Sequence, residues 1–345
     1  MSTALELDAR DRVLVFAPHP DDESIATGGL LQAAGAAGAS RRLVVMTDGD
    51  NNPWPQRWIE KRWFIGARER ARWGARRREE AHAAMRLLGV PEGEAQFLGL
   101  PDLGLTDLLM RADPAVIATL RGILEAFAPT LLALPALSDR HPDHSAAHVL
   151  VRLALARSNA PVPHIVTFAV HGGGAMHGDV AVVLDAAQRD RKRAAILAHE
   201  TQMQFSRSRF VRFARRAELY RSVLKQGADA QHPLRARIEG DALTLRIAPD
   251  RWGASLARTM LFVALETTAG STRWRIPVPE RGARTIVLAG AGDAAVGEGT
   301  STHAAGEIVV SIPWSHAALQ QGYAKLSRPE PGWRVFDRYG WQPVA

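Results

Sequence analysis

The sequence predicts an α/β domain followed by a smaller all-β domain. In the first two thirds of the chain, short apolar runs alternate with amphipathic helical segments, which is typical of a Rossmann-like, mainly parallel sheet flanked by helices. After Gln226-Gly227 only strand-like segments follow, separated by Gly, Pro and Asp, which indicates a C-terminal antiparallel β-sandwich-like domain. We therefore expect two domains, 1–226 and 227–345, with the boundary near 225–232.

The elements of the first domain follow from their hydrophobic period. Strands are read from continuous apolar runs, and helices from apolar residues spaced three and four apart, such as Ala81, Ala84, Met85 and Leu88. Strands are expected at 13–17, 42–47, 95–100, 130–136, 164–170 and 179–185. Helices are expected at 23–38, 77–90, 114–128, 144–158 and 186–203.

The C-terminal domain shows only the alternating pattern of half-buried strands. Its strand-like segments are 235–248, 259–268, 272–279, 284–290, 307–314 and 333–339. It carries tryptophans but no row of aromatics and no ligand cluster, so we expect a structural or interface role for it.

Composition limits the function classes. The 345 residues include no cysteine, which excludes disulfides and thiolate metal sites. The N-terminus does not resemble a signal peptide, and no apolar run approaches the roughly 18 residues of a membrane span, so we expect a cytoplasmic protein. The net charge of +7 fits an anionic partner or a general arginine bias equally well. No nucleic-acid fingerprint accompanies it, and we expect no nucleic-acid partner.

Metal-binding residue types follow the first predicted strand, in the stretch FAPHPDDESIATGG (16–29). In an open parallel sheet, ligands bind at the carboxyl ends of the strands. His19 and Asp22 stand three apart across a strand-to-helix turn, so both can contact one zinc ion. Asp21 is left beside them, where a general base for water should stand. In the competing structural interpretation, Asp22 or Ser24 caps the helix N-terminus and the negative charge of Asp21 interacts favourably with the helix dipole. This interpretation does not explain His19.

A second cluster of the same kind follows the strand predicted at 130–136. The stretch SDRHPDHSAAH contains His141, Asp143, His144 and His148 at the start of a helix. A catalytic zinc takes three protein ligands and keeps one position open. His19, Asp22 and one histidine of this second cluster supply such a set.

The two motifs together resemble the LmbE-like family, also called the PIG-L family, over roughly residues 11–220. Members are zinc-dependent deacetylases of N-acetylated amino sugars. Further segments agree with the family pattern: TDGD (47–50), the R-x-x-E pair Arg77 and Glu80, GLPD (99–102) and KRAAILAHETQ (192–202). Two positions depart from it, because Pro18 replaces an alanine and Thr201 replaces a serine.

The resemblance implies a role for each matching residue. One zinc or similar divalent ion would be held by His19, Asp22 and His144. Asp21 would be the base, and His141 would stabilise the oxyanion or protonate the leaving amine, with Asp143 orienting it. Arg77 and Asp102 match positions that contact substrate, although a solvated arginine and a loop cap are the competing readings. His199 and Gln202 are expected to pack beneath the site. His148, His171 and His177 are expected on a helix face and around a surface loop.

The segment 51–78 interleaves tryptophans with arginines. Trp54, Trp58, Trp63 and Trp73 lie here, after the second predicted strand and hence at the rim of the site. Indoles stack on sugar faces and arginines bind anions, so we expect a lid with Trp58 as a substrate contact. The alternatives are contact with an anionic membrane at the inner face, and a helical insert whose tryptophans pack inward.

These observations predict a zinc hydrolase that removes the N-acetyl group from an amino sugar within an anionic or lipid-linked glycoconjugate. The alternatives are hydrolysis of another amide or acyl conjugate at the same metal site, and a catalytically silent glycan-binding protein. The presence of ligands, base and acid together favours the enzyme.

Overall fold

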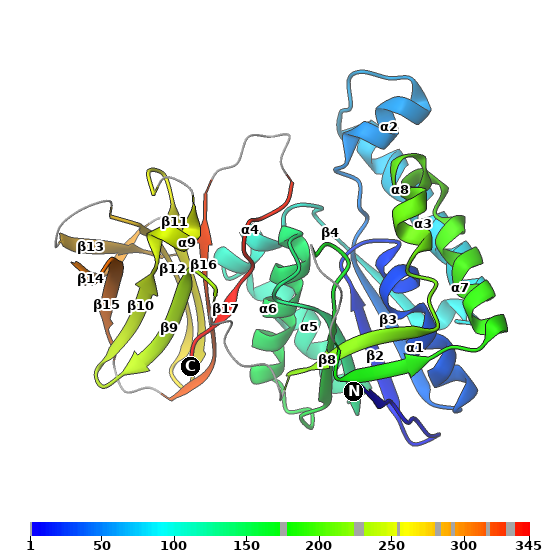
Figure 1. Ribbon diagram of the computed structural model, residues 1–345, viewed down its shortest axis with the longest axis horizontal. Helices are drawn as coiled ribbons and strands as arrows, with labels where there is room; N and C mark the ends of the chain where they lie inside the picture. Colours follow the sequence, from blue (N-terminus) through cyan, green and yellow to red (C-terminus); the bar gives the residue numbers. More distant parts are fainter. Residues whose placement is uncertain are drawn as a thin grey trace. The chain divides into compact units, whose positions relative to one another are not determined.

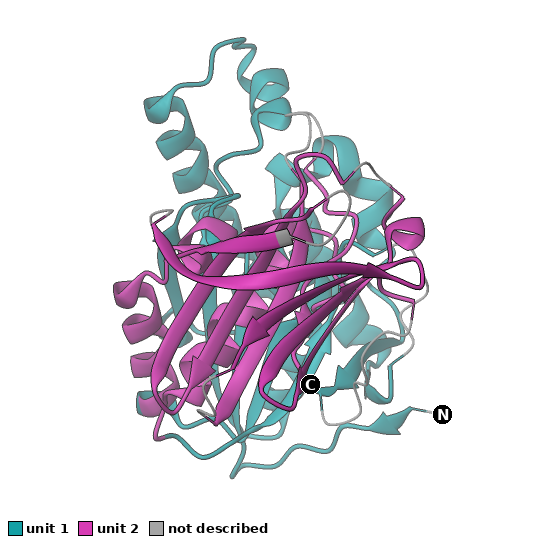
Figure 2. Ribbon diagram, turned by 90° about the vertical axis from the view of Figure 1, so that its left-hand side faces the viewer, with its two compact units in different colours: residues 1–105, 126–136, 160–226 teal, residues 106–125, 137–159, 227–345 magenta. Residues whose placement is uncertain are grey.

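The computed structural model describes residues 2–172, 178–223, 231–253, 256–279, 284–290, 294–314, 318–328 and 335–345. The chain forms two compact units, shown in Figure 2. The first comprises 1–105, 126–136 and 160–226, and the second comprises 106–125, 137–159 and 227–345. The domain boundary predicted at 226 falls within 224–230, outside the described residues, and stays a prediction.

An eight-stranded sheet forms the centre of the first unit (Figure 1). Its strand order is β1-β7-β8-β6-β5-β2-β3-β4, and every pairing is parallel except those of β8 with β6 and β7. The predicted mainly parallel sheet is confirmed. The strands are β1 (Thr3–Ala4), β2 (Arg12–Ala17), β3 (Ser40–Thr47), β4 (Ala95–Leu100), β5 (Leu131–Pro135), β6 (His164–Phe168), β7 (Val180–Val183) and β8 (Ala217–Ser222).

Helices α1, α3 and α7 share one hydrophobic core with this sheet. Ile25, Met85 and Ile196, one from each helix, lie in the same buried cluster as Val15 of β2 and Val45 of β3. Among the helices, α3 begins at Ala67, well before the predicted start at 77. The helices of this unit are α1 (Asp22–Ala36), α2 (Pro53–Glu60), α3 (Ala67–Leu87), η1 (Glu92–Glu94), α7 (Ala186–Ala198) and α8 (Glu200–Val211).

Strand β8 was not predicted, and a buried carboxylate explains its place in the sheet. Glu218 accepts hydrogen bonds from the backbone N–H groups of Gly29 (2.6 Å) and Leu30 (2.8 Å) in α1. It also accepts from Tyr220 Oη (2.7 Å) and pairs with Lys192 of α7. A Cβ at position 29 would lie 2.8 Å from the Glu218 carboxyl carbon, so the glycine makes room for it. The buried charge is therefore fully paired, as burial requires.

The single helix predicted over 186–203 is two helices, because the chain turns at His199 (φ −80°, ψ 63°). The carboxylate of Glu80 in α3 accepts hydrogen bonds from Thr201 N (3.0 Å) and Thr201 Oγ1 (2.6 Å). The carboxylate thereby accepts from a backbone N–H of the first turn of α8, where N–H groups have no partner within the helix. Glu80, the glutamate of the R-x-x-E pair, therefore caps the N-terminus of α8.

The second unit contains a nine-stranded antiparallel sheet that curls until its outer strands meet. Ala236 of β9 forms a bridge with Val344, and Ala345 exchanges backbone hydrogen bonds with Ala236 and Ile238. The sheet is thus nearly a closed barrel. In sheet order its strands are β17 (Gln342–Pro343), β16 (Leu319–Ser327), β11 (Met260–Thr267), β12 (Gly270–Pro277), β13 (Arg284–Ala289), β14 (Ala295–Ala304), β15 (Glu307–Pro313), β10 (Ala242–Ile247) and β9 (Leu234–Glu239).

Three helices from the N-terminal half cluster largely with this sheet: α4 (Leu105–Met110), α5 (Pro114–Phe127) and α6 (Pro142–Ala156). Arg152 Nη2 of α6 donates to Gln321 Oε1 of β16 at 2.8 Å. Arg273 Nε of β12 donates to the carbonyl of Leu109 in α4 at 3.1 Å. Hydrogen bonds between residues distant in the sequence therefore join α4 and α6 to this sheet.

Several expectations for the second unit need correction. The segment 235–248 is a hairpin, β9–β10, because Gly240 adopts φ +59° in its turn. Residues 335–339 form no strand, and Trp333 lies outside the described residues. The polar, glycine-containing β14 and β16 gave no apolar pattern and were missed. No described helix has the length and apolar character needed to span a bilayer.

Candidate metal-binding and catalytic site

The first motif begins where β2 ends. Phe16 and Ala17 are fully buried, and the next carbonyl, that of Pro18, accepts hydrogen bonds from Thr47 N and Thr47 Oγ1, both at 3.0 Å. These bonds join the turn to the end of β3. The turn then leads into α1, which begins at Asp22. Its side chains are therefore held at the carboxyl edge of the sheet, where open α/β sheets bind ligands.

His19 lies between two carboxylates. Its Nδ1 is 3.3 Å from Asp22 Oδ2, and its Nε2 is 3.2 Å from Asp102 Oδ1. Asp102 is itself held by the N–H of Asn51 at 2.7 Å. Burial raises the pKa of Asp102, but the hydrogen bond and charge of His19, the Asn51 N–H and the charge of Arg77 together outweigh burial, and the pKa is lowered overall. A carboxylate that fixes one ring nitrogen orients the other, which is how metal-binding histidines are positioned.

Asp21 has a backbone conformation that few residues other than glycine adopt, with φ 135° and ψ −28°. It occupies the N-cap position of α1, yet its carboxylate makes no capping hydrogen bond. Burial raises its pKa to about 6, and Arg77, whose Nη2 lies 3.5 Å from Asp21 Oδ2, opposes that rise. Strain of this kind persists where the surroundings enforce it, often at functional sites. The N-cap residue is therefore Asp21, and not Asp22 or Ser24 as the structural alternative had it.

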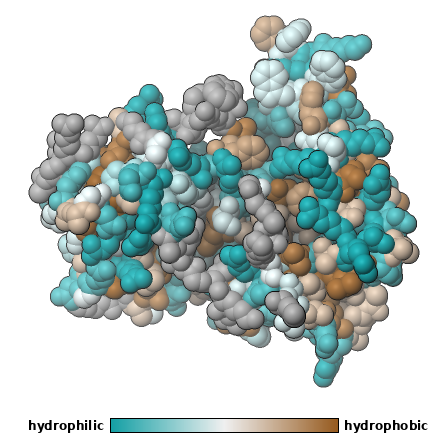
Figure 3. Space-filling model, in the orientation of Figure 1, coloured by the Kyte–Doolittle hydropathy of each residue, from teal (hydrophilic) through white to brown (hydrophobic). Residues whose placement is uncertain are grey.

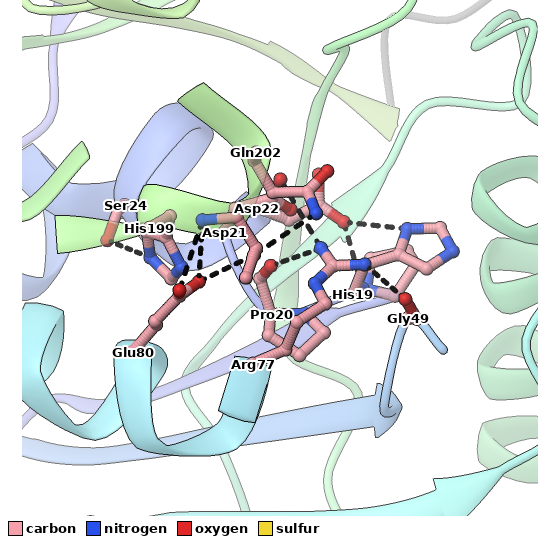
Figure 4. Close-up of polar contacts among 12 residues, drawn as sticks. His19, Pro20, Asp21, Asp22, Ser24, Gly49, Arg77, Glu80, His199 and Gln202 are labelled. Atoms are coloured by element: carbon pink, nitrogen blue, oxygen red, sulfur yellow. Dashed lines mark hydrogen bonds and ion pairs between the residues drawn. The ribbon is translucent and has the colours of Figure 1, made fainter. Parts of the chain in front are cut away.

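Arg77 reaches from α3 into the motif (Figure 4). The side chain is buried, and it donates from Nη1 to the Gly49 carbonyl and from Nη2 to the Pro20 carbonyl, each at 2.6 Å. These bonds connect the ends of β2 and β3 through one guanidinium. Arg77 is thus placed to position Asp21. Substrate contact by Arg77, and by the buried Asp102, stays a prediction.

Gly49, in the TDGD segment, is required by this arrangement. It adopts φ +61°, and a Cβ there would lie 1.8 Å from Arg77 Nη1. We expect Gly49→Ala to lower stability by about 2 kcal/mol or more, because backbone strain and overpacking add. Gly89→Ala is the matched control, since Gly89 adopts φ +72° with no atom within 4 Å of a Cβ. Thermal unfolding of both variants measures the difference; equal losses would show that the Arg77 contact is unimportant.

A buried ion pair supports the strained turn from below. Glu23 Oε2 accepts the N–H of Asp21 at 2.9 Å, and Glu23 Oε1 lies 2.8 Å from His199 Nε2. Burial opposes both charges, but their mutual attraction outweighs it, lowering the pKa of Glu23 and raising that of His199. His199 thus has the supporting place expected for it. The supporting role of Glu23 was missed, because its partner is distant in the sequence.

The second motif starts α6, which begins at Pro142. His141 occupies the N-cap position, and its Nδ1 accepts the N–H of Asp143 at 3.3 Å. The ring proton of neutral His141 is therefore assigned to Nε2. Asp139 accepts the N–H of His141 at 3.0 Å, and its other oxygen lies 3.1 Å from His144 Nδ1. Asp139 is thus the carboxylate partner of His144, a role that sequence reasoning missed although the residue stands in the same stretch, SDRHPDH.

The structure therefore brings together His19, Asp22 and Asp102 in one cluster, and Asp139, His141 and His144 in another, each within its own unit. Trp58 lies on α2 with 68% of its surface exposed, and its ring meets that of Phe205 edge-on at 6.1 Å.

The remaining histidines have other surroundings. His148 is a buried residue of α6 beside the ring of Tyr323, with centroids 6.1 Å apart. His171 Nδ1 lies 2.8 Å from Arg209 Nη2, and His177 falls outside the described residues.

Comparison with known proteins agrees with the motifs. Residues 14–155 match the family described as "PIG-L: GlcNAc-PI de-N-acetylase". A 1D-myo-inositol 2-acetamido-2-deoxy-alpha-D-glucopyranoside deacetylase of Corynebacterium urealyticum is 30% identical over 244 residues, covering 56% of this chain and 72% of the relative. The 2'-N-acetylparomamine deacetylase of Streptomyces fradiae is 35% identical over 163 residues, covering 42% and 53% respectively.

A solved structure, the N,N'-diacetylchitobiose deacetylase from Pyrococcus horikoshii, superposes with a TM-score of 0.49 at 21% identity. The match covers 61% of this chain and 83% of the chain in that structure.

The family match includes both motif clusters, and the first relative is matched over more than two thirds of its length. The chain therefore belongs to the PIG-L family.

Proposed function

We propose that this protein removes the N-acetyl group from an amino sugar in a larger glycoconjugate, with a zinc ion bound at the paired motifs. The observation that carries the proposal is the state of Asp21. It is a buried, strained carboxylate that does not cap its helix, beside a histidine and an aspartate of metal-binding type. Backbone strain that surrounding contacts enforce is found most often at functional sites.

The donor set fits zinc. Strands β2 and β5 are neighbouring parallel strands, so the segments that follow them leave the same edge of the sheet. His19, Asp22 and His144 would supply two nitrogens and one oxygen, the usual catalytic set of three protein ligands. Asp102 supports His19 and Asp139 supports His144, as outer carboxylates do for metal-bound histidines. Another divalent ion with the same preferences is the alternative.

A bound zinc ion would polarise the amide carbonyl and lower the pKa of water at the site. Asp21 would accept the proton of the attacking water, and its raised pKa of about 6 suits a base near neutral pH. The water oxygen adds to the acetyl carbon, and the C–N bond then breaks. His141, with its proton on Nε2 and its ring fixed by the Asp143 N–H, would donate a hydrogen bond to the developing oxyanion, and Asp21 would pass the proton it took from water to the departing nitrogen. The products are acetate and a free amine.

The relatives' names support the substrate class. One acts on an inositol-linked acetamido sugar and the other on an acetylated aminoglycoside. Both names describe removal of an acetyl group from nitrogen. Trp58 stays the proposed stacking contact for the sugar or its aglycone, since its indole is largely exposed. Other amides or acyl conjugates at the same site, and glycan binding without turnover, are the rival functions.

A substrate panel tests the proposal. The purified protein, with zinc content measured, is incubated with free N-acetylglucosamine, inositol-linked and aminoglycoside-type N-acetyl conjugates, and non-sugar acetamides. We expect acetate release and new amines by mass spectrometry from the conjugates, abolished by chelation and restored by zinc. Turnover of the non-sugar acetamides alone would favour the rival hydrolase. Binding without acetate release by the zinc-loaded protein would favour the silent glycan-binding protein.

A further inference from the structure

Large aromatic side chains gather at the end of the α2–α3 projection. We call Trp54, Trp58, Trp63, Phe64 and Phe205 the aromatic tip. Trp63 and Phe64 are 80% and 92% exposed, in the loop between α2 and α3. In Figure 1, α2 and this loop stand away from the sheet of their unit, and Figure 3 shows this end as a projecting surface. The tip is therefore convex.

Such exposure is unusual for these side chains. Scattered exposed apolar residues are normal, but a contiguous patch marks a binding surface. Every exposed tryptophan among the described residues belongs to the tip. Trp73, from the same helical pair, is fully buried, so the segment has a core position available for an indole. The sequence-based alternative of inward-packed tryptophans thus holds for Trp73 and is wrong for the other three.

The tip is held by its own contacts. Gln56 Nε2 of α2 donates to the Glu69 carbonyl of α3 at 2.8 Å, and Arg72 Nη2 donates to Glu60 Oε2 at 2.5 Å. Arg57 Nε donates to the Trp63 carbonyl at 3.0 Å, which fixes the loop. The exposed rings therefore stand on an ordered support and lose little conformational freedom on binding.

Cations surround the aromatic rings. Lys61, Arg62 and Arg68 are exposed beside the loop. Between residues 53 and 72 the acidic residues are Glu60 and Glu69, which are paired with Arg72 and Arg62, and the basic residues of this stretch outnumber them. The net charge facing a partner is therefore positive, in keeping with the +7 of the chain.

We propose that the aromatic tip binds the surface of an anionic lipid bilayer. Tryptophan prefers the headgroup region, and phenylalanine at a loop end can enter the acyl boundary below it. Each cation near an anionic bilayer adds attraction that salt screens. A convex surface with rings pointing outward suits a flat bilayer.

Vesicle co-sedimentation tests this independently of any catalytic function. The full-length protein is mixed with vesicles of phosphatidylcholine alone, or of phosphatidylcholine with phosphatidylserine, at low and high salt. We expect binding to the mixed vesicles at low salt, weakened by salt and by omission of the anionic lipid. Trp63→Ser/Phe64→Ser should weaken binding by about tenfold or more, through lost apolar burial. Lys61→Gln/Arg62→Gln/Arg68→Gln should weaken it similarly and reduce the salt dependence.

The matched control is Val162→Ser/Val183→Ser. These valines are also exposed, at 84% and 66%, but lie outside the tip, and vesicle binding should be unchanged. Equal loss in this control and in Trp63→Ser/Phe64→Ser would overturn the proposal. Failure of the wild-type protein to bind either type of vesicle would also overturn the proposal. Sedimentation velocity without lipid provides a third outcome: a wild-type dimer that becomes monomeric in Trp63→Ser/Phe64→Ser would make a second copy of this chain the partner and overturn the membrane assignment.

Discussion

Replacing Asp21 by asparagine should lower turnover by about a hundredfold or more while leaving metal content unchanged. The size follows from loss of a general base, which typically contributes 10²–10⁴-fold. The amide keeps the volume of the carboxylate, so His19 and Asp22 should keep their places, but it cannot accept the proton of the attacking water. Steady-state kinetics on the substrate found in the panel, with zinc measured on the same sample, checks this.

A companion variant separates catalysis from folding. Asp21→Gly also removes the base but relieves the positive φ, strain that costs on the order of 1–3 kcal/mol. We expect this variant to be inactive and to melt no lower than the wild type. Near wild-type turnover in Asp21→Asn would move the base elsewhere. Glu23, the next candidate by position, already holds the Asp21 N–H and His199 with its two oxygens.

The second large effect is expected in metal content. His19→Ala and His144→Ala should each release most of the roughly one zinc ion per chain, because a site left with two ligands binds far more weakly. Asp139→Asn should weaken affinity less, by about 10–100-fold, since it only orients His144. Elemental analysis after dialysis measures all three. His148→Ala is the control, because that histidine packs beside Tyr323.

Retention of full metal occupancy in a His19→Ala/His144→Ala double variant would contradict the proposed site. Circular dichroism and thermal unfolding of the same samples guard against the trivial case of an unfolded chain. If the double variant is folded and metal-free while vesicle binding through the aromatic tip persists, the two proposals are shown to be independent.

The features that depend on local sequence pattern could be predicted from the sequence. The apolar runs at β2, β3 and β5 were identifiable because strands buried on both faces carry continuous apolar residues. The motifs after β2 and β5 were identifiable because their residue types match metal chemistry and parallel strands share one edge. The residue pattern therefore supplied His19, Asp22 and one histidine of the second motif as candidate ligands, and the family resemblance identified that histidine as His144.

What could not be predicted depends on partners far apart in the chain. Strand β8 is polar, and its place is explained by Glu218 bonding to helix α1, almost two hundred residues earlier. The break at His199 depends on Glu80 of α3. The supporting carboxylates Asp139 and Glu23 showed no pattern of their own. Their roles follow from three-dimensional contacts that no hydrophobic period records.

The nearly closed sheet of the second unit has a consequence for solubility. Its last strand pairs with β16, and the bridge from Val344 to Ala236 covers the open side of β9. Unpaired strand edges are templates for intermolecular pairing. Removing residues 340–345 would expose the backbone donors and acceptors of two long strands at once. The truncated protein should therefore aggregate on heating under conditions in which the intact protein unfolds without aggregating. For the same reason, an affinity tag is better attached at the N-terminus than at the C-terminus.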